Sequence, residues 1–266
     1  MTGDGLTLTV EEGIARITLD RPEAGNAITL PLARALLAAA IRCENDPAIR
    51  CIMMTGNGRL FCAGGDVQLL AGAGRKRPEV LSELIAAVHA AVQRLARGSK
   101  PLVTLVNGPA AGAGFSLAIL GDVVIGARSA HFTAAYGAIG LTPDGGLSWL
   151  LPRLVGLRKA QDIILTNRRI KADEAQAIGL VTRIADDEAL AEEGLTVARA
   201  IAAGPVAALS ASRALLYDSF ETGFETQLDR ELRSMAAAGA SGESEEGLRA
   251  LLQKQTPDFR KVLSVS

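Results

Sequence analysis

The sequence predicts an α/β fold with a largely parallel sheet, followed by a helical subdomain. Up to about residue 184, short apolar runs that favour strands alternate with longer segments of helical periodicity, an order typical of parallel sheets. From residue 186 onward almost every segment has helical periodicity. Apolar residues make up 48% of the 266 residues, which is enough for a sizeable core. We therefore expect a core domain over residues 1–200 and a helical subdomain over residues 201–266.

The first half of the chain carries clear start and stop signals. Two alternating runs flank Glu12-Gly13, which predicts a hairpin. Thr29, with Pro31 soon after it, is typical of a helix start, because threonine caps the first free N–H groups and proline fits the first turn. The expected elements are strands at 6–10, 14–19, 49–55 and 102–106, helices at 29–44 and 79–97, and a loop at 72–78 that carries Arg75, Lys76 and Arg77.

The second half predicts one strand–turn–helix unit and then mainly helices. Gly156 separates two of these helices, and Gly204-Pro205 separates two more in the tail. The expected elements are helices at 112–120, 145–154, 158–166, 171–178, 222–235 and 243–253, and strands at 123–127, 131–133 and 181–184.

Two stretches of the chain share one pattern, an apolar strand followed by a turn of small residues. In the first, strand 51–55 leads into residues 56–67, and in the second, strand 102–106 leads into residues 107–114. Such turns leave backbone N–H groups free to bind, and residues without bulk let a ligand approach closely. Each stretch alone also fits an ordinary tight turn. Together they can aim two backbone donors at one oxygen, which is the general form of an oxyanion hole.

Taken together, these motifs resemble the crotonase family, also called the enoyl-CoA hydratase/isomerase family. The resemblance covers nearly the whole chain in order. Within the family it is closest to the acyl-CoA isomerases that use an aspartate, such as those acting on 2-(1,2-epoxy-1,2-dihydrophenyl)acetyl-CoA. The matching segments are RPEAGNA at 21–27, FCAGGDV at 61–67, NGPAAGAG at 107–114, GLTPDGG at 140–146 and ADEAQAIGLV at 172–181.

This resemblance implies a fold, a substrate class and a set of site residues. The fold is a spiral of ββα units, and the C-terminal helices drive assembly into a homotrimer or a dimer of trimers. The substrate is an acyl-CoA thioester, with no metal and no cofactor besides the coenzyme A of the substrate. The implied oxyanion donors are the N–H groups of Gly65 and Ala113. The implied positions that bind substrate or CoA are Ala24, Ala63, Gly65, Asp66, Val67, Ala113, Tyr136, Phe259 and Lys261, of which the last two contact CoA bound to a neighbouring subunit.

The acid–base positions depart from the hydratase pattern of the family. Hydratases use two glutamates to place and deprotonate water, at positions that hold Ser116 and Tyr136 here. Neither side chain is a carboxylate base, which disfavours plain hydration. A third family position is filled by Asp144. One carboxylate is enough for an isomerase, because the same group removes a proton and returns it. We therefore expect Asp144 to move a double bond, or to rearrange a ring epoxide, through a thioester enolate.

Other functions stay open for these residues. Spacing alone fits Asp144 as a helix N-cap. In the dehalogenase branch of the family, the aspartate at this position attacks an aryl-CoA ring, and His89 matches the histidine of that branch, although an apolar helix more often carries a packed core histidine. The loss of both glutamates also fits other acyl-CoA chemistry, or a CoA-binding protein without catalysis. The apolar stripes of the tail need a partner surface, which either the core or a neighbouring subunit can provide.

Composition and charge narrow the remaining classes of function and the expected compartment. The net charge of −1 gives no electrostatic footprint for nucleic acid. No apolar run reaches membrane-spanning length, and the N-terminus lacks a basic region followed by an apolar core. Cys43, Cys51 and Cys62 follow no metal or disulfide spacing, which suits a reducing compartment. We expect a cytoplasmic protein without nucleic-acid or membrane partners.

Overall fold

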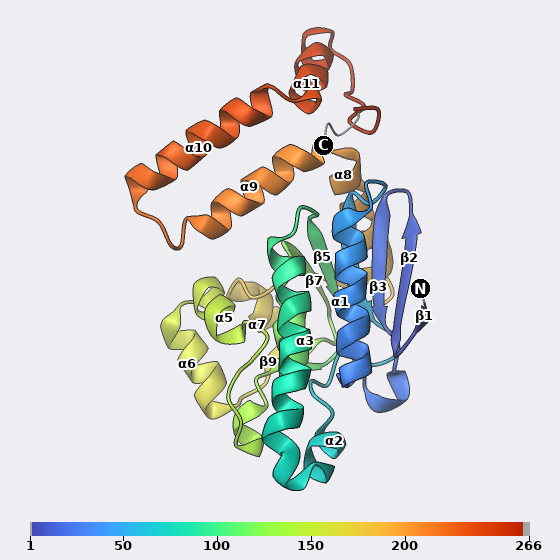
Figure 1. The fold of residues 1–266 in the computed structure, drawn as a ribbon, viewed down its shortest axis with the longest axis vertical. Helices are drawn as coiled ribbons and strands as arrows, with labels where there is room; N and C mark the ends of the chain where they lie inside the picture. The colour runs from blue at the N-terminus through green and yellow to red at the C-terminus, as the bar shows by residue number, and fades with distance from the viewer. Residues whose placement is uncertain (1, 263–266) are drawn as a thin grey trace.

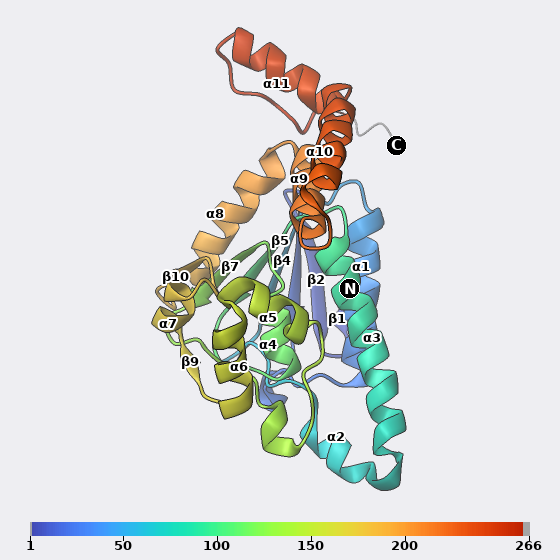
Figure 2. The same ribbon diagram turned by 90° about the vertical axis from the view of Figure 1, so that its left-hand side faces the viewer.

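A central sheet with helices on both faces forms the core of the protein (Figures 1 and 2). The computed structural model describes residues 2–262. Seven strands pair in the order β1-β2-β3-β4-β5-β7-β10. The antiparallel part comprises β1 (Thr2–Gly3), β2 (Leu6–Glu11) and β3 (Ile14–Leu19). The strands that continue parallel to β3 are β4 (Cys51–Gly56), β5 (Leu102–Val106), β7 (Val123–Ala127) and β10 (Arg183–Ala185).

Helices cover both faces of this sheet. α1 (Leu30–Asn45) and α3 (Arg77–Arg97) pack together on one face, and α8 (Leu190–Ala203) lies on the other (Figure 2). Strand β5 is therefore buried along its whole length, and β4 at nearly every position. This explains why both strands read as continuous apolar runs rather than as alternating ones.

The parallel direction of the strands brings the two small-residue stretches together. β4 and β5 are neighbours and end at the same edge of the sheet, so the chain leaves both at one place. There Cys62 pairs with Ala110 and Gly65 pairs with Ile28. A small second sheet supports this region and consists of β6 (Ala110–Ala111), β8 (His131–Thr133) and β9 (Ile170–Lys171).

The remaining elements of the core have the predicted type more often than the predicted bounds. β5, β7 and β8 have the predicted bounds, and Thr29 caps α1 by accepting from the N–H of Leu32. The loop predicted at 72–78 was wrong, because a 3-10 turn there leads directly into α3. The other core helices are η1 (Pro22–Ala24), α2 (Val67–Gly72), η2 (Gly74–Lys76), α4 (Ala113–Ala118), η3 (Tyr136–Ile139), α5 (Leu147–Val155), α6 (Leu157–Thr166) and α7 (Ala172–Ala177).

The chain leaves the core between α8 and α9 (Val206–Asp218). α8 runs unbroken across residue 200, where we predicted a domain boundary, and its residue Ala202 is fully buried. α8 and α9 meet at an angle of 104°, and only as this bent pair do they reach the length and hydropathy of a membrane span. No single helix within residues 2–262 does so.

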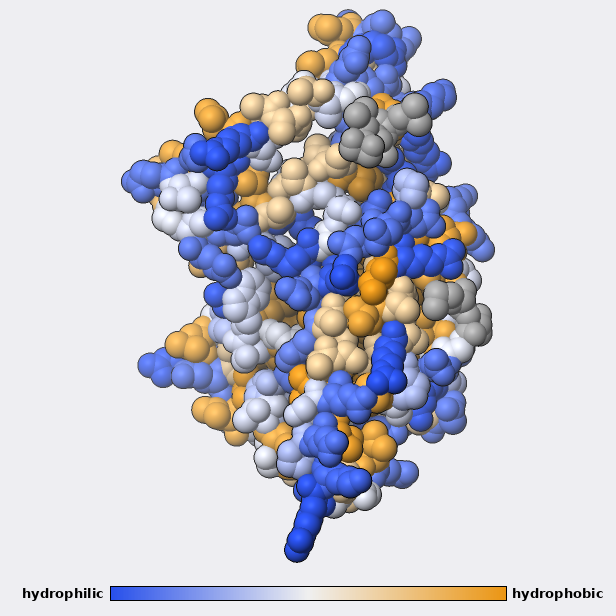
Figure 3. Space-filling view, in the orientation of Figure 1, coloured by the Kyte–Doolittle hydropathy of each residue, from blue (hydrophilic) through white to orange (hydrophobic). Residues whose placement is uncertain are grey.

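The C-terminal helices project beyond the core (Figure 1). α9 is tied back by the buried Arg213, whose guanidinium pairs with Asp122 at 2.5 Å and donates to the carbonyl of Leu95. α10 (Phe224–Gly239) buries none of its residues within the chain, and α11 (Gly242–Leu252) buries one. Apolar atoms consequently lie on the surface in the upper part of Figure 3. The exposed apolar side chains of this region include Leu216, Phe224, Leu228, Leu232, Met235, Leu248, Leu251 and Leu252.

Candidate active site

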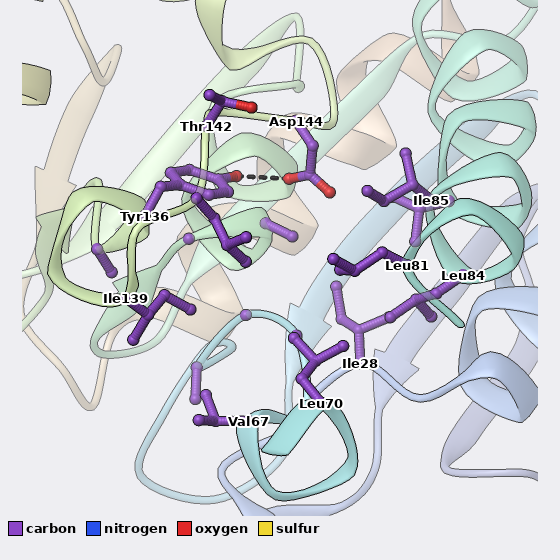
Figure 4. A pocket seen from close by; sticks show the side chains of 18 of the residues that line it. Ile28, Val67, Leu70, Leu81, Leu84, Ile85, Tyr136, Ile139, Thr142 and Asp144 are labelled. Atoms are coloured by element: carbon purple, nitrogen blue, oxygen red, sulfur yellow. Dashed lines mark hydrogen bonds between the residues drawn. The ribbon is translucent and has the colours of Figure 1, made fainter. Parts of the chain in front are cut away.

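A cavity of about 340 Å³ lies beside the segments that follow β4 and β5 (Figure 4). One wall is apolar and comes from α2 and α3, with the side chains of Leu70, Leu81, Leu84, Ile85 and Val88. The opposite wall is formed by residues 135–144 and carries the polar groups of Tyr136, Thr142 and Asp144. Among the described residues that line the cavity, Asp144 is the only one with a charged side chain.

Two backbone donors line this cavity. Within residues 2–262, neither the N–H of Gly65 nor that of Ala113 has a hydrogen-bond acceptor. Ala113 is the first residue of α4, where an N–H has no acceptor within the helix. The two segments are in contact, since a Cβ atom placed on Gly64 would lie 3.4 Å from the amide nitrogen of Ala113. The two donors therefore come from adjacent segments that line the same cavity.

Close backbone packing explains the small residues here. Gly64 has a φ of 95°, and a Cβ atom on it would lie 2.7 Å from the carbonyl oxygen of Ala111. A Cβ atom on Gly114 would lie only 2.2 Å from the carbonyl oxygen of Cys62. Gly65 differs, because a Cβ atom there meets no protein atom within 4 Å. Of these three glycines, Gly65 is the one whose missing side chain leaves room for a ligand.

Asn26 holds the loop that leads to Gly65. Its side chain is fully buried, and its backbone is left-handed with a φ of 55°. The side-chain amide donates to the carbonyl oxygens of three loop residues, at 2.8 to 3.1 Å, and these are Asn57, Leu60 and Phe61. Removing a buried donor would leave these carbonyls without partners, so Asn26 fixes one side of the site.

Asp144 is held by two hydroxyl groups. The hydroxyl of Tyr136 donates to Oδ1 of Asp144 at 2.6 Å (Figure 4). Ser116 Oγ donates to the backbone carbonyl of Asp144 at 2.9 Å and lies 3.1 Å from the hydroxyl oxygen of Tyr136. Burial, and then the neighbouring Asp144, raise the pKa of Tyr136 above its usual value, so the phenol keeps its proton and remains a donor.

The helix-cap interpretation of Asp144 is wrong. α5 begins at Leu147, its N-cap position is Gly146, and no side chain caps it. The carboxylate of Asp144 contacts Tyr136 instead, and only the backbone carbonyl of Asp144 accepts from the helix, from the N–H of Leu147.

His89 approaches the same loop from α3. Its Nε2 atom accepts a hydrogen bond from the N–H of Gly145 at 3.0 Å. The side chain is exposed, so the expectation of a packed core histidine was wrong. His131 lies elsewhere, on β8, and does not line the cavity.

Comparison with known proteins decides the family. Residues 9–262 match the model of the family described as Enoyl-CoA hydratase/isomerase. The chain belongs to the enoyl-CoA hydratase/isomerase family. The 1,2-epoxyphenylacetyl-CoA isomerase of Escherichia coli (strain K12) is 37% identical to it, over 94% of this chain and 96% of that protein. The 2,3-dehydroadipyl-CoA hydratase of the same organism is 32% identical, over 96% and 98%.

Solved structures agree with this assignment. An enoyl-CoA hydratase from Polaromonas sp. JS666 superposes with a TM-score of 0.91 at 34% identity, and the match covers 95% of this chain and 98% of that one. The crotonase fold expected from the sequence is thereby confirmed, and so is an enzyme of this acyl-CoA family. Both isomerases and hydratases occur among the relatives, so the reaction has to be argued from the site.

The enoyl-CoA hydratase/isomerase resemblance implied several binding residues, and the structure brings only some of them together. Ala63, Val67 and Tyr136 line the cavity together with both donors. Ala24 and Asp66 do not line it: Ala24 ends η1, and Asp66 caps α2 and lies 3.8 Å from Arg21.

The two C-terminal residues are far from this cavity. Phe259 packs against Gly247 of α11, and Lys261 pairs with Asp258 at 3.0 Å. The segment lies at the end of the molecule opposite α2 (Figure 1). Within one chain, neither Phe259 nor Lys261 lines this cavity.

Sequence reasoning missed the apolar wall on α3. Leu81, Leu84, Ile85 and Val88 follow each other at the spacing of one helix face. That spacing is equally typical of a helix packed on a core, so periodicity alone does not identify a cavity wall.

Proposed function

We propose that the protein is an acyl-CoA isomerase that moves a carbon–carbon double bond through a thioester enolate. The observation that carries the proposal is the composition of one cavity. It is lined by two backbone N–H groups without acceptors in the described chain, those of Gly65 and Ala113, and by the carboxylate of Asp144.

The chemistry follows from these three groups. The thioester carbonyl oxygen accepts from both N–H groups, and these bonds strengthen as negative charge develops on that oxygen. Each such donor is typically worth ~3 kcal/mol in the transition state. Asp144 takes the proton from Cα as a base and returns it to Cγ as an acid. The double bond moves into conjugation with the carbonyl, and the carboxylate is regenerated.

Hydration of a 2-enoyl-CoA is the less favoured reaction at this site. It requires a carboxylate pair that positions and deprotonates water, and the corresponding positions hold Ser116 and Tyr136. Their hydroxyls are already bonded to Asp144, and the raised pKa of Tyr136 prevents it from serving as a base near neutral pH.

The cavity favours uncharged acyl groups. Its walls are mostly aliphatic, and no lysine, arginine or histidine side chain occurs among the described residues that line it. An acyl chain with a terminal carboxylate would bury that charge without a partner, which costs several kcal/mol. The E. coli relative named for an epoxyphenylacetyl group makes an aryl-acetyl thioester with a ring epoxide the second substrate to test.

We also propose a homotrimer, or a dimer of trimers, in which the tail of one subunit completes the CoA site of the next. The unburied apolar face of α10 supports this, because the core of its own chain does not cover it. Phe259 and Lys261 would then meet the CoA of a neighbouring subunit.

A pair of assays tests the proposed reaction. A 3-enoyl-CoA is incubated with the protein, and the conjugated 2-enoyl-CoA is followed by its absorbance. In parallel, 2-enoyl-CoA is supplied and the loss of the conjugated absorbance is followed. We expect conjugation to appear in the first assay and to persist in the second. Faster hydration than isomerisation would overturn the proposal, as would oxygen label from water on Asp144 after a single turnover.

A further inference from the structure

Polar atoms of Tyr136, Ser116 and Asp144 form a ring of short contacts beside the cavity. Tyr136 Oη lies 2.6 Å from Oδ1 of Asp144, Ser116 Oγ lies 2.9 Å from the carbonyl oxygen of Asp144, and the two hydroxyl oxygens are 3.1 Å apart. Each hydroxyl has a single hydrogen. Tyr136 therefore gives its hydrogen to the carboxylate, and Ser116 gives its hydrogen to the backbone.

The two carboxylate oxygens of Asp144 are consequently not equivalent. Oδ1 is occupied by the phenol of Tyr136, whereas the other oxygen points toward the side of the cavity that carries Ile85 (Figure 4). Tyr136 itself is 8% exposed and Ser116 is 2% exposed, so both hydroxyls are removed from bulk water. A buried donor to an ionised acceptor gives a short and directional hydrogen bond.

We propose that Tyr136 is a positioning residue that presents a single oxygen of Asp144 to the substrate, with Ser116 holding the Asp144 peptide in place. This inference rests on the proposed isomerase function. With Oδ1 occupied, the second oxygen alone takes the proton from Cα and returns it to Cγ on the same face of the enolate. The two hydroxyls thus occupy the places of hydratase carboxylates but orient the base instead of binding water.

Few other groups can influence the ionisation of this carboxylate. In the described lining, Tyr136 is the only other titratable side chain. From α3, His89 meets the peptide after Asp144 through the N–H of Gly145. α2 and η3 place no further charged side chain in the cavity lining.

The test compares the two tyrosines of the chain. Tyr136→Phe removes only the donor to Asp144 and keeps the ring. Tyr217→Phe is the matched control, because Tyr217 lies on α9 and stacks on Trp149 outside the cavity. For Tyr136→Phe we expect kcat for 3-enoyl-CoA isomerisation to fall about 10- to 100-fold with KM nearly unchanged. The control should keep both constants.

Two further readouts separate positioning from mere packing. Loss of a hydrogen bond to the ionised carboxylate moves the acid limb of the kcat profile to higher pH in Tyr136→Phe. With substrate deuterated at Cα, the fraction of label carried to Cγ falls below the wild-type value, because the freed carboxyl group can turn. Ser116→Ala should reproduce both effects in smaller size, and it serves alone if Tyr136→Phe does not fold.

The outcomes distinguish this inference from the function on which it rests. An active wild-type enzyme whose kcat, acid limb and label transfer are unchanged by Tyr136→Phe, or by Ser116→Ala where that variant stands alone, overturns the positioning role only. A wild-type protein without isomerase activity overturns the proposed function and this role with it. A rise of KM with kcat unchanged would make Tyr136 a substrate-binding residue, and it would also overturn the positioning role.

Discussion

His89 accepts a hydrogen bond from the backbone N–H of Gly145, at 3.0 Å between Nε2 and the amide nitrogen. Gly145 directly follows Asp144, so the contact fixes the turn that carries the carboxylate. Gly145 has a φ of 58°, and a Cβ atom on it would lie 2.8 Å from Cβ of Ser116, so the turn is closely packed as well. In this contact the imidazole accepts through the lone pair of Nε2.

Removal of the His89 acceptor should slow the reaction without changing substrate affinity. In His89→Ala we expect kcat to fall about fivefold, the equivalent of one ordinary hydrogen bond. His89→Gln can still present an oxygen to the N–H of Gly145 and should recover part of this loss. Steady-state kinetics of both variants checks the prediction, which fails if His89→Ala keeps the wild-type kcat or if glutamine restores nothing.

The glycines of the site should separate into ligand-facing and backbone-facing positions. Gly65→Ala places a methyl group in open space within the cavity, so we expect an unchanged melting temperature and a lower kcat/KM. Gly114→Ala places the same group 2.2 Å from the carbonyl oxygen of Cys62, so it should destabilise the fold by several kcal/mol. Thermal unfolding and steady-state kinetics of both variants test this prediction. Equal loss of stability in both variants would contradict the assignment.

The unburied apolar face of α10 should hold the proposed trimer together. Leu232 and Met235 are 69% and 75% exposed in the single chain, so glutamate at either position should prevent association while leaving the circular dichroism spectrum unchanged. Sedimentation velocity at micromolar concentration measures this. The double variant Phe259→Ala with Lys261→Ala is the control: it should stay assembled and bind CoA more weakly. A well-folded monomer of the full-length wild-type chain would rule out the proposed trimer.

Single helices and strands can be predicted from the sequence better than the tertiary contacts between them. β5, β7 and β8 are apolar runs bounded by turn residues, and their bounds were predicted correctly because both signals are local. The two-residue strands β6 and β9 were not predicted, since they exist only through pairing with β8. The start of α3 was also missed, although Pro78 at the beginning of a helix is a typical signal.

The same limit applies to the candidate site. The family resemblance indicated Gly65, Ala113 and Asp144, which line one cavity. The closed ring of Ser116, Tyr136 and Asp144 joins α4, η3 and the loop before α5. Only tertiary packing brings these three elements together, so spacing along the chain gives no sign of it.

The buried thiols should weaken the fold at alkaline pH. Burial raises the pKa of Cys43 to about 11 and that of Cys51 to about 12, from an ordinary value of 9.0. The thiols hold their protons more tightly in the folded state than in the unfolded state. Their contribution to the free energy of unfolding is therefore complete below pH 9 and is lost as the pH rises toward 12. We expect the free energy of unfolding to fall less steeply above pH 9 in Cys43→Ala with Cys51→Ala.

Urea denaturation at a series of pH values measures this dependence. Between pH 7 and pH 8 the double variant and the wild type should show parallel curves, since neither state loses thiol protons there. Parallel curves over the whole alkaline range would contradict the prediction.

The central claim is that Asp144 is the acid and base of an isomerase, and Asp144→Asn tests it most directly. The amide oxygen of asparagine can still accept from Tyr136, so the fold and the affinity for the acyl-CoA should persist. We predict that kcat for converting 3-enoyl-CoA to 2-enoyl-CoA falls about 10²- to 10⁴-fold, the usual contribution of a general acid–base group. A variant that isomerises the substrate at the wild-type rate would contradict the account.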